Sequence, residues 1–102
     1  MKPLTYKDAI RSTTVVLVEF FATWCPHCQK MMPVMDEIKQ SLAGKVNVYQ
    51  FDIDKYQGLD DENNVEVVPT FIIYVDGREV WRQSGEMAKD QIMAEVERAL
   101  KM

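Results

Sequence analysis

The sequence predicts an α/β fold in which a mixed central β-sheet is flanked by helices on both faces. A nearly continuous apolar run at 14–21 is typical of a strand that is covered on both faces. A helical stripe of apolar residues follows this run, and a second strand-like run comes after the stripe. Nearer the C-terminus, Asp76-Gly77 separates two further strand-like runs, which is a strong signal for a β-hairpin.

The first half of the chain is expected to begin with a short helix near 6–11, followed by the strand at 14–21. Pro26 suits the first turn of the next helix, because its missing N–H would have no partner there. Gly44 is expected to end this helix, and Pro33 predicts a kink within it. The apolar stripe of the helix consists of Met31, Met35, Ile38 and Leu42.

The second half is expected to contain a strand at 46–52, a short helix near 58–63, and the hairpin strands 70–75 and 78–83. The first two strands of the sheet should be parallel, because a helical crossover joins them. A final amphipathic helix is marked by Ile92, Val96, Ala99 and Leu100. We expect residues 1–102 to form one domain, because a chain of this length leaves no room for a second core.

Composition and charge argue against several classes of function. The chain is 47% hydrophobic and carries a formal net charge of −4, with acidic and basic residues mixed along it. It shows no basic stripe, so nucleic acid is not an expected partner. No apolar run is long enough to span a bilayer, and the N-terminus lacks the features of a secretory signal. We expect a monomer without a membrane partner in the cytoplasm, or in the periplasm if a signal peptide was removed.

The two cysteines, Cys25 and Cys28, lie three positions apart. Closing so short a loop removes little conformational entropy from the unfolded chain, so a disulfide here would add little stability. A zinc site normally takes four ligands, whereas the chain has no other cysteine and a single histidine, His27, between these two. We therefore expect no metal, and we interpret the pair as chemically reactive.

A Cys-x-x-Cys pair at the start of a helix has the properties that thiol–disulfide exchange requires. Cys25 lies at the N-terminal end, where unpaired N–H groups and the helix dipole stabilise a thiolate. Cys28 lies one turn inside and should keep its proton longer. Cys25 is therefore the candidate nucleophile and Cys28 the candidate resolving thiol. A redox-inert binding module and a metal-bridged dimer are the alternatives.

The segment around the cysteines resembles the active-site segment of the thioredoxin family, over the run 18–28 (VEFFATWCPHC). Pro33 stands where that family kinks its active-site helix, and Val68-Pro69-Thr70 resembles its cis-proline loop. Asp76-Gly77 resembles its hairpin, and Ser84-Gly85 resembles the wall of its peptide-binding groove. The resemblance runs from about residue 15 to the C-terminus. The shorter N-terminal segment leaves the presence of the family's first edge strand open.

This resemblance implies the thioredoxin fold and a protein-disulfide oxidoreductase that needs no bound cofactor. In the implied cycle, Cys25 attacks a substrate disulfide, and Cys28 then attacks Cys25 and releases the reduced substrate. The implied partners are protein disulfides or dithiols as substrates, and thioredoxin reductase or another redox partner for recharging. Pro69 is implied to be cis and opposite the cysteines. The implied substrate-binding residues are Trp24, Val68, Pro69, Thr70 and Gly85.

Three positions depart from the usual thioredoxin pattern. Glu19 replaces a buried aspartate; we expect it to be buried, to have a raised pKa, and to accept the Cys28 proton through water. Gln50 replaces the lysine partner of that acid, so the charged form of Glu19 loses a stabilising cation. Pro26-His27 replaces Gly-Pro and resembles the dipeptide of the DsbA family of disulfide-forming oxidases.

Pro26 and His27 are the candidate redox-tuning residues. A histidine beside the cysteines is expected to stabilise the Cys25 thiolate by charge or hydrogen bonding. Stabilising the reduced form makes the disulfide a stronger oxidant. We therefore expect a thioredoxin-type reductase with a less reducing poise, and a disulfide-forming oxidase of DsbA-like chemistry is the alternative.

Overall fold

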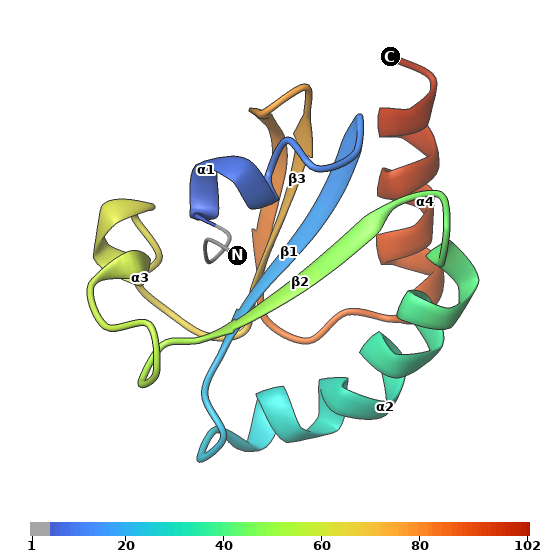
Figure 1. Cartoon of the computed structure of the whole chain (residues 1–102). Helices are drawn as coiled ribbons and strands as arrows, with labels where there is room; N and C mark the ends of the chain where they lie inside the picture. Colours follow the sequence, from blue (N-terminus) through green and yellow to red (C-terminus); the bar gives the residue numbers. More distant parts are fainter. Residues whose placement is uncertain (1–4) are drawn as a thin grey trace.

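The computed structural model describes residues 5–102, which form a mixed sheet with helices on both faces, as the sequence predicts (Figure 1). Within these residues the strands are β1 (Val15–Phe21), β2 (Asn47–Asp52), β3 (Thr70–Val75) and β4 (Arg78–Ser84). The helices are α1 (Tyr6–Ala9), α2 (Pro26–Leu42), α3 (Leu59–Glu62) and α4 (Lys89–Leu100). The strand order is β2-β1-β3-β4; β2 is parallel to β1, and the other neighbouring pairs are antiparallel.

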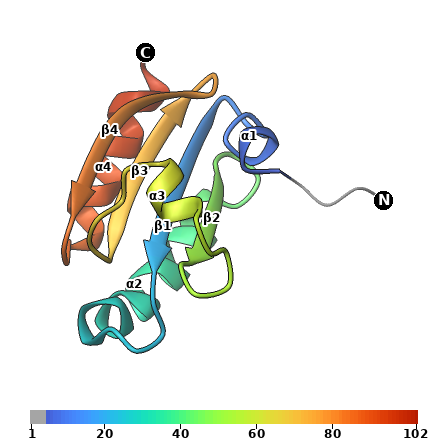
Figure 2. The same cartoon turned by 90° about the vertical axis from the view of Figure 1, so that its left-hand side faces the viewer.

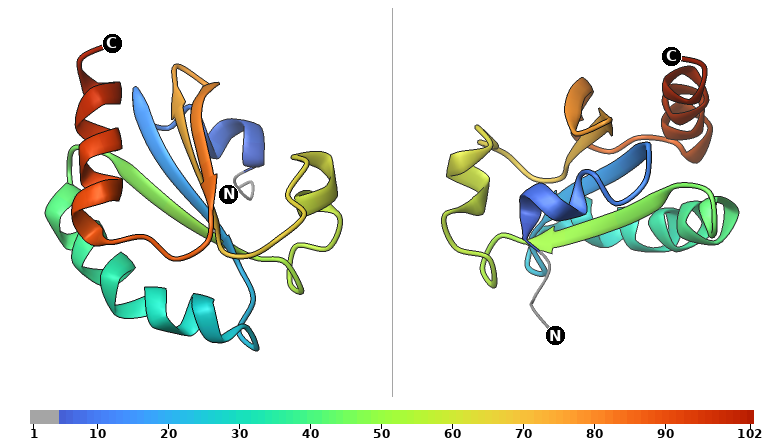
Figure 3. Two further views of the ribbon diagram at one scale, coloured as in Figure 1. Left: turned by 180° about the vertical axis from the view of Figure 1, so that it is seen from behind. Right: turned by 45° about the horizontal axis from the view of Figure 1, so that its top comes forward.

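Helices α2 and α4 lie on one face of the sheet, and α1 and α3 lie on the opposite face (Figures 2 and 3). Strand β1 lies between them and is buried on both sides. Val15 and Leu17 pack into the core formed with α2 and α4, whereas Val16, Val18 and Phe20 pack into the core on the α1 and α3 side. The alternation of side chains along a strand therefore explains why this strand is apolar at nearly every position.

Helix α2 carries the cysteine pair and is anchored by its predicted stripe. Met31, Met35, Ile38 and Leu42 are each 2% exposed or less. Pro33 lies inside the helix, and Figure 1 shows the helix bending along its length. A proline removes one backbone hydrogen bond and displaces the preceding turn, which accounts for the bend. The helix ends at Leu42, and Gly44 adopts a φ of +80°, as the sequence predicts for a glycine stop.

The hairpin between β3 and β4 turns at Asp76 and Gly77, whose φ angles are +52° and +80°. Positive φ at both positions is what a two-residue hairpin loop requires, so this prediction is confirmed. The expected helix near 6–11 is found at Tyr6–Ala9. Any edge strand before it would fall on residues 1–4, which lie outside the described residues. Across residues 5–102, no helix combines the length and the apolar composition needed to cross a membrane.

Candidate active site

The site is built where β1 leads into α2. Cys25 is the N-cap residue of α2, with φ −85° and ψ 119°, and Pro26 occupies the first turn. The first N–H groups of a helix have no partners within the helix, so they are available to a sulfur at the N-cap. Both cysteines are free thiols. Cys25 is 6% exposed and Cys28 is 2% exposed.

The two thiols have opposite acidities. The backbone N–H of Cys28 is the main cause that lowers the pKa of Cys25, and the Cys28 thiol and the backbone N–H of His27 add to it. Burial and the negative charge of Glu86 oppose this lowering. Burial raises the pKa of Cys28 to about 12, and the proximity of Cys25 and Glu19 adds to the rise. The arrangement therefore favours a thiolate at Cys25 and a protonated thiol at Cys28.

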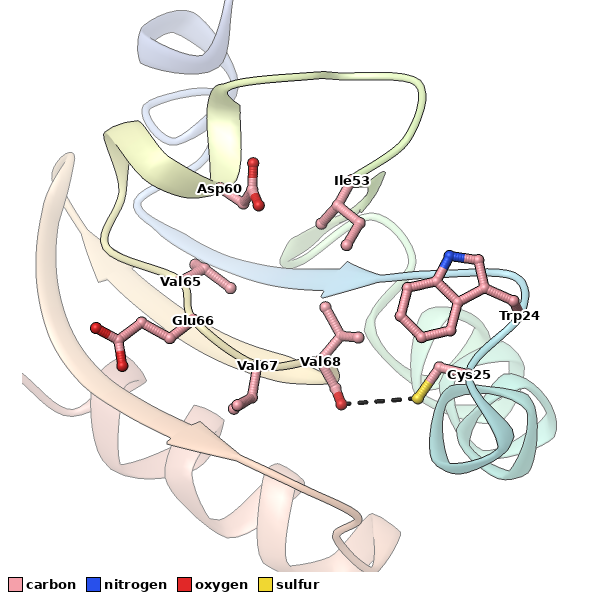
Figure 4. Close-up of a pocket in the computed structure, with 8 residues that line it drawn as sticks. All are labelled: Trp24, Cys25, Ile53, Asp60, Val65, Glu66, Val67 and Val68. Carbon is pink, nitrogen blue, oxygen red and sulfur yellow. Dashed lines mark hydrogen bonds between the residues drawn. The ribbon is translucent and has the colours of Figure 1, made fainter.

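The loop before β3 lies opposite Cys25. The Val68–Pro69 peptide bond is cis, as the resemblance implied, and the Cys25 Sγ lies 3.7 Å from the Val68 carbonyl oxygen, to which its thiol donates. Figure 4 shows this contact at the edge of an open pocket of about 290 Å³. The lining residues are Trp24, Cys25, Ile53, Asp60, Val65, Glu66, Val67 and Val68. The only side-chain charges among these lining residues are negative.

Some of the candidate substrate-binding residues border the pocket, whereas Thr70 is buried. Trp24 and Val68 line the pocket; the Trp24 ring is fixed because its Nε1–H donates to Asp54 Oδ2 at 2.9 Å. Gly85 borders the site through its N–H, which donates to the Pro69 carbonyl at 2.8 Å. Thr70, in contrast, is 1% exposed, and its hydroxyl bonds Val67 O at 2.6 Å and Ser84 Oγ at 2.8 Å. The Thr70 hydroxyl therefore braces the loop, and a substrate-binding role for Thr70 stays a prediction.

Glu19 is buried in the middle of β1, as predicted, with 2% exposure. Gln50 lies directly beside it on β2 and donates from Nε2 to Glu19 Oε1 at 2.9 Å. Burial raises the pKa of Glu19 to about 7, although the Gln50 hydrogen bond and the charge of Lys39 act in the opposite direction. A cavity of about 100 Å³ is lined by both Glu19 and Cys28, together with Gln50. The carboxyl group and the resolving thiol therefore face a common space.

The structure places the His27 ring differently from expectation. His27 Nδ1 bonds the Glu86 carboxylate, and the two side chains are 64% and 38% exposed. The stabilising contact from His27 to Cys25 comes from the backbone N–H rather than from the imidazole. Sequence reasoning missed Glu86, although it directly follows Gly85 of the expected groove wall. It also missed Lys39, whose charge acts on Glu19 from α2.

Within residues 5–102, no group of three or more His, Cys, Asp or Glu side chains is arranged to hold a metal ion. Glu19 offers a carboxyl group beside Cys28, and Glu86 offers one beside His27.

The chain is similar to known thioredoxins in sequence and in structure. The family model described as Thioredoxin matches residues 1–98. The chain is 36% identical over 92 residues to thioredoxin Y of rice chloroplasts (Oryza sativa subsp. japonica). The alignment covers 90% of this chain and 55% of the rice protein. It is 31% identical to a thioredoxin of Rickettsia felis, covering 85% of this chain and 83% of that protein. The chain thus spans about half the length of the chloroplast relative.

Among solved structures, a mutant thioredoxin from Halobacterium salinarum NRC-1 superimposes with a TM-score of 0.83. Its sequence is 29% identical, and the alignment covers 91% of this chain and 80% of that one. The mixed sheet and its helices therefore form the thioredoxin fold.

Glu19→Gln is expected to stabilise the fold at neutral and alkaline pH. The pKa of Glu19 rises from 4.5 to about 7 on folding, so ionisation opposes the folded state. The free energy of unfolding of the unsubstituted protein should fall as pH rises from about 4.5 to about 7, and the full penalty persists above that range. A shift of this size corresponds to about 3 kcal/mol. Glutamine keeps the acceptor for Gln50 and removes the charge.

Urea unfolding of both proteins at about pH 4 and about pH 8 tests this expectation. The variant should be more stable by about 2 to 3 kcal/mol at the higher pH, with the gain nearly absent at the lower pH. Exposed Glu37→Gln is the matched control and should show no such pH-dependent gain. A gain for Glu19→Gln that is equal at both pH values would contradict the assignment of a buried, titrating carboxyl group.

Proposed function

Because the chain belongs to the thioredoxin family, we propose that it is a thiol–disulfide oxidoreductase that exchanges a Cys25–Cys28 dithiol with protein disulfides. The observation that carries this proposal is the opposite acidity of the two thiols, which lie one helical turn apart, with Cys25 on the lining of an open pocket. A thiolate is the nucleophile in disulfide exchange, and a neighbouring thiol is needed to resolve the mixed disulfide.

In the first step the Cys25 thiolate attacks one sulfur of a substrate disulfide. A bond forms between Cys25 and that sulfur, and the second substrate sulfur leaves as a thiolate. An extended substrate segment is expected to lie in the pocket and to pair with the backbone of Val68, whose carbonyl already lies beside Cys25. The exposed Trp24 ring, held by Asp54, supplies an apolar wall for that segment.

In the second step Cys28 loses its proton and attacks the Cys25 sulfur. The substrate is released with its remaining sulfur as a thiolate, and Cys25 and Cys28 form a disulfide, so that two electrons pass to the substrate. Glu19 is the proposed proton acceptor, with a water molecule in the shared cavity as the carrier. A pKa of about 7 suits this role, because the group can take up and release a proton near neutral pH.

A dithiol donor must then return two electrons to the Cys25–Cys28 disulfide. Thioredoxin reductase, or another redox partner with this chemistry, is the proposed donor. No bound cofactor is required within this chain, because both electrons are held by the cysteine sulfurs.

The proposed poise is less reducing than that of an ordinary thioredoxin. The lowered pKa of Cys25 supports this, because a stabilised thiolate favours the reduced protein. The Pro26-His27 dipeptide, which resembles that of the DsbA family, favours a disulfide-forming oxidase as the second candidate. The same enzyme would then run in the opposite direction, accepting electrons from substrate thiols.

Replacing either cysteine by serine is expected to stop turnover at a different step. Cys25→Ser should abolish the reduction of insulin disulfides driven by dithiothreitol, since the nucleophile is lost. Cys28→Ser should form the mixed disulfide without resolving it, so that a covalent adduct accumulates in non-reducing mass spectrometry. Gln40→Ala, an exposed change farther along α2, is the control and should retain full activity. If the unsubstituted protein and the three variants all reduce insulin only at the rate of dithiothreitol alone, a redox-inert binding module would be favoured.

Glu19→Gln is expected to slow the resolution step by about tenfold to a hundredfold near pH 7, because a positioned general base is lost. Stopped-flow mixing of the reduced protein with a disulfide substrate separates mixed-disulfide formation from its resolution. The first step should keep its rate, since Glu19 faces Cys28 and not the pocket. A variant that resolves the mixed disulfide at the original rate would remove Glu19 from the mechanism.

The poise is tested by equilibrating the protein with reduced and oxidised glutathione. We expect a potential above about −270 mV, the value typical of thioredoxin. His27→Gly should favour the protein disulfide by about threefold to tenfold in the equilibrium constant, because Glu86, whose charge raises the pKa of Cys25, loses its hydrogen-bond donor. A potential that stays unchanged in this variant would count against redox tuning by His27.

A further inference from the structure

The loop between β4 and α4 is held on both sides of Glu86. On one side, the Gly85 N–H donates to the Pro69 carbonyl at 2.8 Å, which ties the loop to the cis-proline segment. On the other side, Met87 is 7% exposed, and its N–H donates to Met31 Sδ on α2 at 3.5 Å. The backbone of Glu86 is therefore fixed beside the first turns of α2, although its side chain is partly exposed.

From this position the Glu86 carboxylate accepts a hydrogen bond from His27 Nδ1. Lys30 also faces Glu86 from the next turn of α2. The His27 bond is the main cause that lowers the pKa of Glu86, with a smaller contribution from Lys30, so the carboxylate stays ionised. This contact joins residues 59 positions apart and fixes the ring on the groove wall rather than on Cys25.

The charge of Glu86 acts on the reactive thiol in the direction opposite to the helix N-terminus. Its negative charge raises the pKa of Cys25, against the lowering by the N–H groups of Cys28 and His27. The Glu86 carboxylate repels the Cys25 thiolate and also keeps the His27 ring away from it. Both effects disfavour the reduced form of the Cys25–Cys28 pair.

We propose that Glu86 is a positioning residue that holds the His27 ring against the β4–α4 loop and thereby makes the Cys25–Cys28 pair more reducing than its Cys-Pro-His-Cys motif alone would. The inference rests on the proposed thiol–disulfide exchange and extends it to a residue outside the motif. The measured reaction is the protein disulfide plus two reduced glutathione molecules giving the protein dithiol plus oxidised glutathione. Two electrons and two protons are transferred in each cycle.

The test is a double-substitution cycle with Glu86→Gln, His27→Ala and the combined variant. Glutathione equilibria are measured at one fixed pH for the unsubstituted protein and all three variants. Glu86→Gln should favour the protein dithiol by about threefold, which is about 14 mV for a two-electron couple. In the His27→Ala background the same change should have a smaller effect, because only the carboxylate charge is removed and no ring is released.

Glu37→Gln is the matched control, because Glu37 is an exposed acid farther along α2 and outside the pocket beside Cys25. It should leave the equilibrium nearly unchanged. The ultraviolet absorbance of the Cys25 thiolate, followed against pH, gives a second readout that needs no exchange partner. Glu86→Gln should lower the apparent pKa of this thiolate relative to the unsubstituted protein.

The outcomes separate the inference from the proposed function. If Glu86→Gln changes neither readout, or if its effect is the same with and without His27, positioning of the ring by Glu86 is ruled out. If the unsubstituted protein does not exchange with glutathione while its thiolate titration still responds to Glu86, the electrostatic coupling stands and the exchange function is wrong. Restoration of the original equilibrium by Glu86→Asp would support the carboxylate as the acting group.

Discussion

The unpaired N–H groups in the first turn of α2 are the interaction on which the site depends. They lower the pKa of Cys25 at the N-cap, while the same helix buries Cys28 one turn further and raises its pKa to about 12. The helix can hold this position because Met31 and Met35 pack into the core against β1 and α4. Core packing thus decides which of the two identical side chains has the lower pKa, and in the proposed cycle this side chain is the one that reacts first.

Glu19 shows that the core around this helix is not optimised for stability alone. Its neighbours along β1 are buried and apolar, and a carboxyl group among them is costly when it ionises. Gln50 supplies a hydrogen bond without a full positive charge, so the pKa remains near 7. A better-stabilised carboxylate would have a lower pKa and would accept a proton less readily. The instability of the charged form is therefore the property that would suit Glu19 to the proton transfer with Cys28 that we propose.

The fold and the reactive pair could be predicted from the sequence because their signals are local. The apolar run of β1, the stripe on α2 and the Asp76-Gly77 turn each reflect interactions between residues close in the chain. Side-chain partners that are distant in sequence could not be predicted in this way. Thr70 adjoins the cis-proline, but its hydroxyl bonds Ser84 across the hairpin, and the His27 ring bonds Glu86 on a loop 59 residues away. Hydrophobic period and motif spacing carry no information on such contacts.

The same distinction applies to the redox poise. The Cys-x-x-Cys dipeptide describes the groups closest to the sulfurs along the chain, but the potential depends on every charge that the thiolate experiences in space. Here the histidine of the motif is bonded to a carboxylate on the groove wall, and this carboxylate also repels the thiolate. In the poise that we propose, a dipeptide that resembles that of the DsbA family is thus combined with a neighbour that acts toward reduction. The loop between β4 and α4, although outside the motif, is where the fold can adjust the potential without altering the cysteines or their helix.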